Sequence, residues 1–169
     1  FISVSSEGEI NLQELLDSIN EKTLLVSIHL ANNEIGTIQP IHEIAEYAHS
    51  VGAWVHTDAA QAIGKIPIHV DELGVDLLSM SAHKLYGPKG IGALYIRGGT
   101  KAIPLAPMFY GGGQEFGLRP GTSNVSSIVG FGEAAQLCAH NLDVENSRIQ
   151  RLRDHFEESL LSCIPGLVI

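Results

Sequence analysis

The pattern of apolar and polar positions predicts an alternating order of strands and helices. A continuous apolar run, "TLLVSIHL" at 23–30, is typical of a buried strand. The runs "AWVHTD" at 53–58, "VDLLSMSAH" at 75–83 and "GIGALYIR" at 90–97 predict three further strands. Between the first two, "PIHEIAEYAHSVG" has apolar residues three and four positions apart, which predicts a helix that begins near Pro40 and ends at Gly52.

This order of elements is that of an α/β unit with a mostly parallel sheet. After the fourth predicted strand comes a glycine-rich loop, "GGGQEFGLRPGTSN" at 111–124. The next two segments, "VSSIVGFGEAAQLCAHNL" at 125–142 and "ENSRIQRLRDHFEESLLSC" at 145–163, predict two separate helices. The apolar ends of the chain, "FISV" and "GLVI", indicate an internal fragment of a longer protein.

Composition excludes several classes of protein. The 169 residues are 44% hydrophobic and 17% charged, which predicts a packed core and excludes a disordered chain. A net charge of −9 with scattered basic residues argues against a nucleic-acid partner. No apolar run has the roughly 18 residues of a membrane span, so no membrane partner is expected. Cys138 and Cys163 match neither a disulfide framework nor a zinc motif, and we expect a cytoplasmic protein, with an organelle left open.

Polar residues gather where the predicted strands end. In open α/β sheets, ligands bind outside the carboxyl ends of the strands, so residues there are candidates for a site. Three clusters occupy these ends: Asn32, Asn33 and Glu34 after the first strand, Asp58 and Gln61 after the second, and Ser81, His83 and Lys84 after the third.

Lys84 and Asp58 each allow a chemical and a structural interpretation. A lysine at the mouth of a sheet is partly desolvated, and its neutral amine forms Schiff bases with carbonyls; the alternative is a solvated surface lysine. Asp58 can hold a proton on a heteroaromatic nitrogen, or it can simply form a turn. Pyridoxal phosphate requires such a lysine and such a carboxylate together.

The remaining polar residues extend this hypothesis. Gln61 can donate to the phenolate oxygen of the same ring. Ser81 and His83 alternate along a predicted strand, so we expect them to face one side and to hold a phosphate together. His56 and Asp58 share a strand face but lack a third ligand at metal spacing, so no metal site is predicted. We interpret His42 and His49 as a solvated flank of the predicted helix.

Four motifs carry a resemblance to a known family: "HLANNEIGTIQPI", "VHTDAAQAIGKIPI", "DLLSMSAHKLYGPKGIGALYIR", and the loop that contains "GGGQE" and "GLRPGT". From about residue 7 to residue 160 the chain resembles the cysteine desulfurases of the NifS/IscS type, and their relatives the selenocysteine lyases. These are fold-type I pyridoxal phosphate enzymes of aminotransferase class V. The resemblance implies that residues 1–140 form part of the cofactor-binding large domain, a mostly parallel sheet flanked by helices. Residues 141–169 would then form a helix that leads toward a C-terminal small domain.

The resemblance also implies a role at the cofactor for seven residues. They are Lys84 as the covalent attachment and catalytic base, Asp58 at the pyridinium nitrogen, Gln61 at the phenolate oxygen, Ser81 and His83 at the phosphate, Asn33 near the cofactor and the substrate carboxylate, and Thr122 at the phosphate of a neighbouring subunit. The last of these implies a homodimer.

The activity that the resemblance implies is conversion of L-cysteine to L-alanine. The sulfur would pass to a cysteine downstream of residue 169, and then to an acceptor or scaffold protein for iron–sulfur cluster assembly. Phe116 stands where the family usually has arginine, and Pro120 stands where bacterial desulfurases often have serine, so L-selenocysteine remains an alternative substrate. A non-catalytic scaffold is the alternative of another class, but it would not need Lys84, Asp58 and Gln61 together. We expect this chain alone to be inactive, because residues outside it would complete the site.

Overall fold

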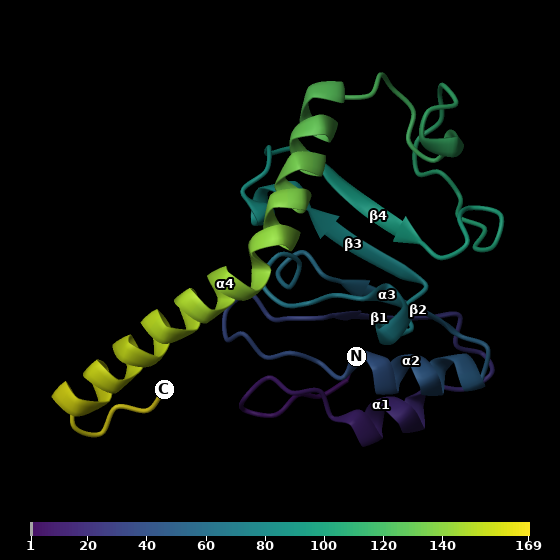
Figure 1. The fold of residues 1–169 in the computed structure, drawn as a ribbon. Coiled ribbons are helices and arrows are strands. Elements are labelled where there is room, and N and C mark those ends of the chain that lie inside the picture. The colour runs from purple at the N-terminus through teal and green to yellow at the C-terminus, as the bar shows by residue number, and fades with distance from the viewer. Residues whose placement is uncertain (1) are drawn as a thin grey trace.

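Four strands form one sheet in the computed structural model, which describes residues 2–169. They are β1 (Leu25–His29), β2 (Trp54–Asp58), β3 (Leu77–Ser81) and β4 (Gly92–Ile96), and they lie in this order across the sheet (Figure 1). The first three strands are parallel, whereas β4 runs antiparallel to β3. The predicted α/β class and mostly parallel sheet are therefore confirmed, and each strand lies within its predicted range.

Helices α1 (Leu12–Ser18) and α2 (Ile41–Ser50) cover one face of the sheet (Figure 1). The apolar face predicted for α2 is buried at all four positions, namely Ile41, Ile44, Ala45 and Ala48. These side chains join one core cluster with the apolar strand residues Val26, Val55 and Leu78. Gly52 has a φ of +83°, the left-handed conformation that ends the helix as predicted.

The C-terminal segment differs from the prediction of two helices. Residues Val125–Cys163 form one continuous helix, α4. The gap between the two predicted helices, "DV" at 143–144, contains neither glycine nor proline, and polar side chains on either side of it bond within the helix. Asn141 donates to the Leu137 carbonyl at 2.8 Å, and Ser147 donates to the Asp143 carbonyl at 2.8 Å. Polar side chains on both sides of the predicted gap thus satisfy carbonyls of the preceding turn, and the helix continues through it.

Figure 1 shows α4 crossing the end of β3 and then extending away from the sheet. The predicted domain boundary at 140/141 falls inside this helix and stays a prediction. Among the described residues, no helix is both long enough and apolar enough to cross a membrane.

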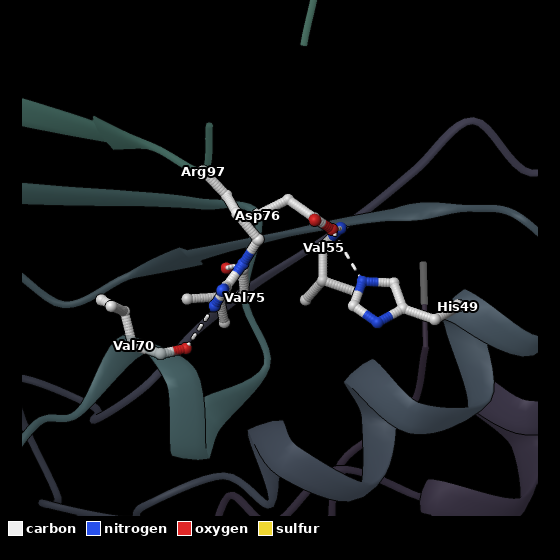
Figure 2. Close-up of polar contacts among 6 residues, drawn as sticks. All are labelled: His49, Val55, Val70, Val75, Asp76 and Arg97. Atoms are coloured by element: carbon white, nitrogen blue, oxygen red, sulfur yellow. Dashed lines mark hydrogen bonds and ion pairs between the residues drawn. The ribbon is translucent and has the colours of Figure 1, made fainter. Parts of the chain in front are cut away.

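A buried carboxylate connects α2 to the edge of the sheet at which the parallel strands begin. Asp76, just before β3, accepts hydrogen bonds from the Val55 amide and from His49 Nε2, each at 2.8 Å (Figure 2). His49 is therefore bonded to the sheet edge, and only His42, which is exposed, fits the predicted solvated flank. Periodicity gave no sign of this contact because its partner lies 27 residues away.

Arg97 closes the same edge from β4. Its Nε donates to the Val75 carbonyl at 2.9 Å, and its Nη2 donates to the Val70 carbonyl at 2.7 Å, at the start of the short helix α3 (Val70–Leu73) (Figure 2). The hydrogen bond with Asp71 is the main cause that raises the pKa of Arg97. These polar contacts stabilise the edge at which the parallel strands begin. None of them involves the carboxyl ends of the strands, where the sequence predicts a site.

Removing the Asp76 carboxylate should destabilise the protein. Asp76→Ala leaves the Val55 amide without its buried acceptor and should lower the free energy of unfolding by about 1–3 kcal/mol. Asp76→Asn keeps an acceptor oxygen and should recover most of that loss. Urea denaturation provides the measurement, with Asp143→Asn on the exposed part of α4 as the control, expected within about 0.5 kcal/mol of the native protein. An Asp76→Ala variant as stable as the control would contradict the assigned role.

Candidate functional site

Parallel pairing brings the carboxyl ends of three strands to one edge of the sheet. In the strand register, His29 of β1 lies beside Asp58 of β2, and Asp58 lies beside Ser79 of β3. The chain that leaves each strand carries one of the three predicted polar clusters. The register therefore gathers the turns that follow β1, β2 and β3, as the sequence predicted.

Lys84 lies in a 3-10 turn, η1 (Ala82–Leu85), directly after β3. Within this turn, His83 Nδ1 lies 2.8 Å from the hydroxyl of Ser81, the last residue of the strand. The two side chains meet as predicted, but the reason given was wrong, because His83 belongs to the turn and not to an alternating strand. His83 and Lys84 are exposed, and Ser81 is half-buried.

A tight backbone turn fixes the position of Lys84. Tyr86 has a φ of +63°, a conformation that costs a non-glycine residue energy, and the Gly87 amide closes the turn on the Ala82 carbonyl at 3.0 Å. A Cβ on Gly87 would lie 2.9 Å from that carbonyl oxygen. Only glycine fits at this position, which explains why Gly87 follows the lysine-bearing turn.

Helix α4 packs closely on this turn through a row of small side chains. A Cβ on Gly130 would lie 2.8 Å from Pro88 Cγ, and the Ala134 Cβ lies close to Gly87. One turn further along α4, Cys138 Sγ lies 3.6 Å from the Leu85 carbonyl oxygen. This contact is consistent with a packing role for Cys138. Larger residues at these positions would force the helix away from the lysine-bearing turn.

Asp58 and Gln61 lie on the turn that follows β2. One carboxylate oxygen of Asp58, Oδ1, accepts the Ala60 amide at 2.8 Å, so the side chain also stabilises the turn. Gln61 Oε1 is buried and has no hydrogen-bond partner among residues 2–169. Because a buried polar atom without a partner is costly, Gln61 has capacity to bond a group that the protein itself does not provide.

Asn33 and Thr122 lie apart from these contacts. Asn33 is exposed in the turn after β1, where the neighbouring Asn32 side chain accepts the Glu34 and Ile35 amides at 2.8 and 3.1 Å. Thr122 is exposed in the segment between β4 and α4, which Figure 1 shows extending away from the sheet. No hydrogen bond among residues 2–169 joins either side chain to the turn that carries Lys84, so their roles stay predictions.

Two groups near the site have perturbed protonation that the sequence did not reveal. Burial, and then the positive charge of Lys84, lower the pKa of Lys65, whose Nζ donates to the Gln61 carbonyl at 3.1 Å. Burial also lowers the pKa of His56, while the Asp58 carboxylate acts in the opposite direction. Burial is the largest cause of both shifts, and it depends on how the elements pack, so the sequence carries no local signal for it.

Two other features do not contribute to this site. A cleft of about 1000 Å³ lies over β4 and the start of α4, lined partly by Leu94, Phe116 and Phe131, and it contains none of the seven predicted residues. In the part of the chain that the structure describes, no three His, Cys, Asp or Glu side chains come together as a metal site. The edge formed by the ends of β2 and β3 is therefore the candidate site.

A lysine on a strand-end turn and an aspartate on the neighbouring strand are the pair of side chains that an enzyme using pyridoxal phosphate requires. Comparison with known sequences agrees. The profile of the family described as "Aminotransferase class-V" matches residues 1–169. The chain belongs to this family, whose members use pyridoxal 5′-phosphate.

Proteins of similar sequence are named cysteine desulfurases, the family that the four sequence motifs resemble. A cysteine desulfurase IscS of Dictyoglomus turgidum is 50% identical over 156 residues, which cover 92% of this chain and 39% of that protein. A mitochondrial cysteine desulfurase of Saccharomyces cerevisiae is 50% identical over 162 residues, which cover 96% of this chain and 32% of that protein. The chain therefore spans about a third to two fifths of the length of these curated relatives.

Solved structures share the fold. A "NifS-like protein" superposes with a TM-score of 0.90 at 43% identity, covering 96% of this chain and 44% of that one. A structure described as "SspA in complex with cysteine" superposes with a TM-score of 0.76 at 46% identity, covering 80% of this chain and 39% of that one. The predicted fold-type I architecture is thus confirmed for the segment described.

The residues present fit a pyridoxal phosphate group. Gln61 has an unused buried oxygen, and because amide oxygen and nitrogen positions are interchangeable by rotation, the group can donate to or accept from a ring substituent. The Ser81–His83 pair offers hydroxyl and imidazole donors for a phosphate. Lys84 would supply an amine for the carbonyl carbon of the group, and Asp58 would supply a carboxylate for its ring nitrogen.

Two glycines on α4 test whether helix packing fixes the lysine turn. A Cβ added to Gly132 would meet no other atom within 4 Å, whereas a Cβ added to Gly130 would lie 2.8 Å from Pro88 Cγ. Gly132→Ala should raise the free energy of unfolding by about 0.5–1 kcal/mol, as alanine favours helix. Gly130→Ala gains the same propensity but must displace Pro88, so it should show no such gain and should weaken pyridoxal phosphate binding.

The measurements are thermal unfolding and absorbance titration with pyridoxal phosphate. Equal stabilisation and equal cofactor affinity in the two variants would show that α4 does not constrain the lysine turn.

Proposed function

We propose that this chain is the cofactor-binding part of a cysteine desulfurase that converts L-cysteine to L-alanine and delivers the sulfur for iron–sulfur cluster assembly. The observation that carries the proposal is the convergence of Lys84 and Asp58 at one sheet edge, beside Gln61 with its unpaired buried oxygen. The names of the relatives at about 50% identity support the choice of substrate. A turn-forming aspartate and a surface lysine would explain the first two residues, but not the orphaned glutamine oxygen.

Each side chain has a proposed task that its contacts support. When bound, pyridoxal phosphate supplies an electron sink for the bond-breaking step. Lys84 anchors the group through its amine and then moves the α-proton of the substrate. The backbone turn closed by Gly87 limits the directions that this amine can reach. Asp58 keeps the ring nitrogen protonated through its carboxylate, which is held by the Ala60 amide at one oxygen.

The phosphate end has a separate set of proposed ligands. Ser81 and His83 already contact each other at 2.8 Å, so their donors need little reorganisation to bind an anion together. Asn33 is proposed near the substrate carboxylate. Thr122 lies in an exposed segment, which is compatible with a contact to the phosphate of a second subunit, and we propose a homodimer on that ground.

The sulfur-accepting cysteine is proposed to lie outside these residues. Cys138 is half-buried against the Leu85 carbonyl, and Cys163 lies at the exposed end of α4. Pro120 in the loop before α4 keeps L-selenocysteine as the second candidate substrate. The sulfur bound to that cysteine as a persulfide would pass to a sulfur-acceptor or scaffold protein, in the cytoplasm or in an organelle.

The function is tested by assaying the protein expressed from its complete gene. With pyridoxal phosphate and L-cysteine, it should release alanine and sulfide in the presence of a thiol reductant. Lys84→Ala should abolish turnover, because both the anchor and the proton-transferring amine are lost. Lys89→Ala, an exposed lysine five positions away, is the matched control and should retain activity.

Substrate preference is measured by assaying the same protein with L-selenocysteine in place of L-cysteine. If kcat/KM for L-selenocysteine exceeded kcat/KM for L-cysteine by orders of magnitude, the protein would be a selenocysteine lyase and not a cysteine desulfurase. Full activity of Lys84→Ala, or none in the native protein with either substrate, would refute the proposed function.

Asp58→Asn separates the electronic role of this residue from its turn-forming role. Asparagine can still accept the Ala60 amide, so the melting temperature should stay near that of the native protein. Removal of the negative charge should slow α-proton removal by about 10²- to 10⁴-fold, since an ion pair shielded from water is lost. Single-turnover kinetics of the cofactor-loaded protein, followed by stopped-flow absorbance, provide the measurement. A near-normal rate would leave Asp58 with a structural role only.

A further inference from the structure

One side chain from each of the three parallel strands forms a hydrogen-bonded row on the sheet face that bears Asp58. His56 Nδ1 lies 2.8 Å from Ser27 Oγ of β1, and His56 Nε2 lies 3.3 Å from Ser79 Oγ of β3. Ser27 is the register partner of His56, and Ser79 is the register partner of Asp58. Ser27 and His56 therefore lie one side-chain step behind Asp58, whereas Ser79 lies beside Asp58 on the neighbouring strand.

The chemistry of this row suits a neutral imidazole. A neutral histidine has one donor and one acceptor nitrogen, and each serine hydroxyl can both donate and accept, so both nitrogens are satisfied in either tautomer. Burial is the main influence on His56 and lowers its pKa, while the Asp58 carboxylate acts against this. The two hydroxyls thus hold the half-buried imidazole in place, and burial favours its neutral form.

Asp58 is the only carboxylate among the described residues of the four strands. On the same face, His29 of β1 is the register partner of Asp58. Two residues along a strand lie about 7 Å apart, close enough for a charge on His56 to act on Asp58 through the protein. A positive charge at position 56 would offset part of the negative charge of Asp58, which would then stabilise a protonated ring nitrogen of the cofactor less strongly.

We propose that His56 is a positioning residue for Asp58: the Ser27 and Ser79 hydroxyls hold its imidazole fixed and uncharged behind the carboxylate, so that the charge of Asp58 is reserved for the ring nitrogen of the cofactor. This inference rests on the role proposed for Asp58. It adds a third strand to the site, since β1 contributes Ser27. A histidine that merely fills space in the sheet would need no particular charge.

The test compares three variants by titrating the protein from its complete gene with pyridoxal 5′-phosphate and with its 1-deaza analogue, which lacks the ring nitrogen. His56→Gln keeps a neutral side chain with donor and acceptor, and its affinity for pyridoxal phosphate should stay within about two-fold of the native value. His56→Lys adds a fixed charge and should weaken that affinity on the order of ten-fold. His42→Lys, on the exposed side of α2, is the matched control and should change neither affinity.

The analogue distinguishes an electrostatic role from simple damage to the fold. His56→Lys should bind the 1-deaza analogue nearly as well as the native protein does, because no ring-nitrogen charge is involved. Equal weakening for both compounds, or equal behaviour of the Gln and Lys variants, would overturn the inference while leaving the proposed function intact. A native protein that fails to bind pyridoxal phosphate would overturn the proposed function, and the inference with it.

A second measurement does not depend on the folding of His56→Lys. In a proton NMR titration, Asp58→Asn should lower the pKa of His56 relative to the native protein, since the carboxylate that opposes the effect of burial is gone. An unchanged pKa would show that the two side chains are not coupled and would equally overturn the inference.

Discussion

The parallel pairing of β1, β2 and β3 is the constraint on which the proposed site depends. Backbone hydrogen bonds set the register that aligns His29, Asp58 and Ser79, and strand alternation then places Asp58 and Ser79 on the same face. A shift of one residue in β2 would turn Asp58 toward the helices and Thr57 toward the site. That shift is opposed because Val55 and Thr57 are fully buried on the helix-covered face. Core packing thus fixes the chemistry of the opposite face.

Stability and proposed chemistry occupy opposite edges of the sheet. The edge where the parallel strands begin holds Asp76, whose carboxylate bonds the Val55 amide and His49. The edge where they end has Gln61 with a buried oxygen that lacks a partner, and Tyr86 in a strained left-handed conformation. Such unpaired and strained groups persist where the surrounding structure over-determines them, and they are frequent at functional sites. Here α4 supplies that constraint through Gly130, packed against Pro88 of the lysine turn.

The sequence predicted what depends on local periodicity. All four strands and α2 were found in their predicted ranges, and Asp58 and Lys84 were found at strand ends, because apolar runs and turn residues are local signals. Predictions failed where a contact outside the local pattern decides the outcome. Two helices were predicted where α4 is continuous through residues 143 and 144, and His49 was assigned to solvent, yet it bonds buried Asp76. The Ser27–His56–Ser79 row was missed for a related reason, because it exists only once the strand register is known.

The central claim is that Lys84 is the lysine presented to pyridoxal phosphate. Borohydride reduction of the cofactor-loaded protein, followed by proteolysis and mass spectrometry, tests it most directly. The cofactor mass should appear on the peptide that contains Lys84, and the label should be lost in Lys84→Ala. Lys65 is the informative competitor, because burial lowers its pKa and the charge of Lys84 reaches it. A label on Lys65 or Lys89 would contradict the proposed geometry of the site.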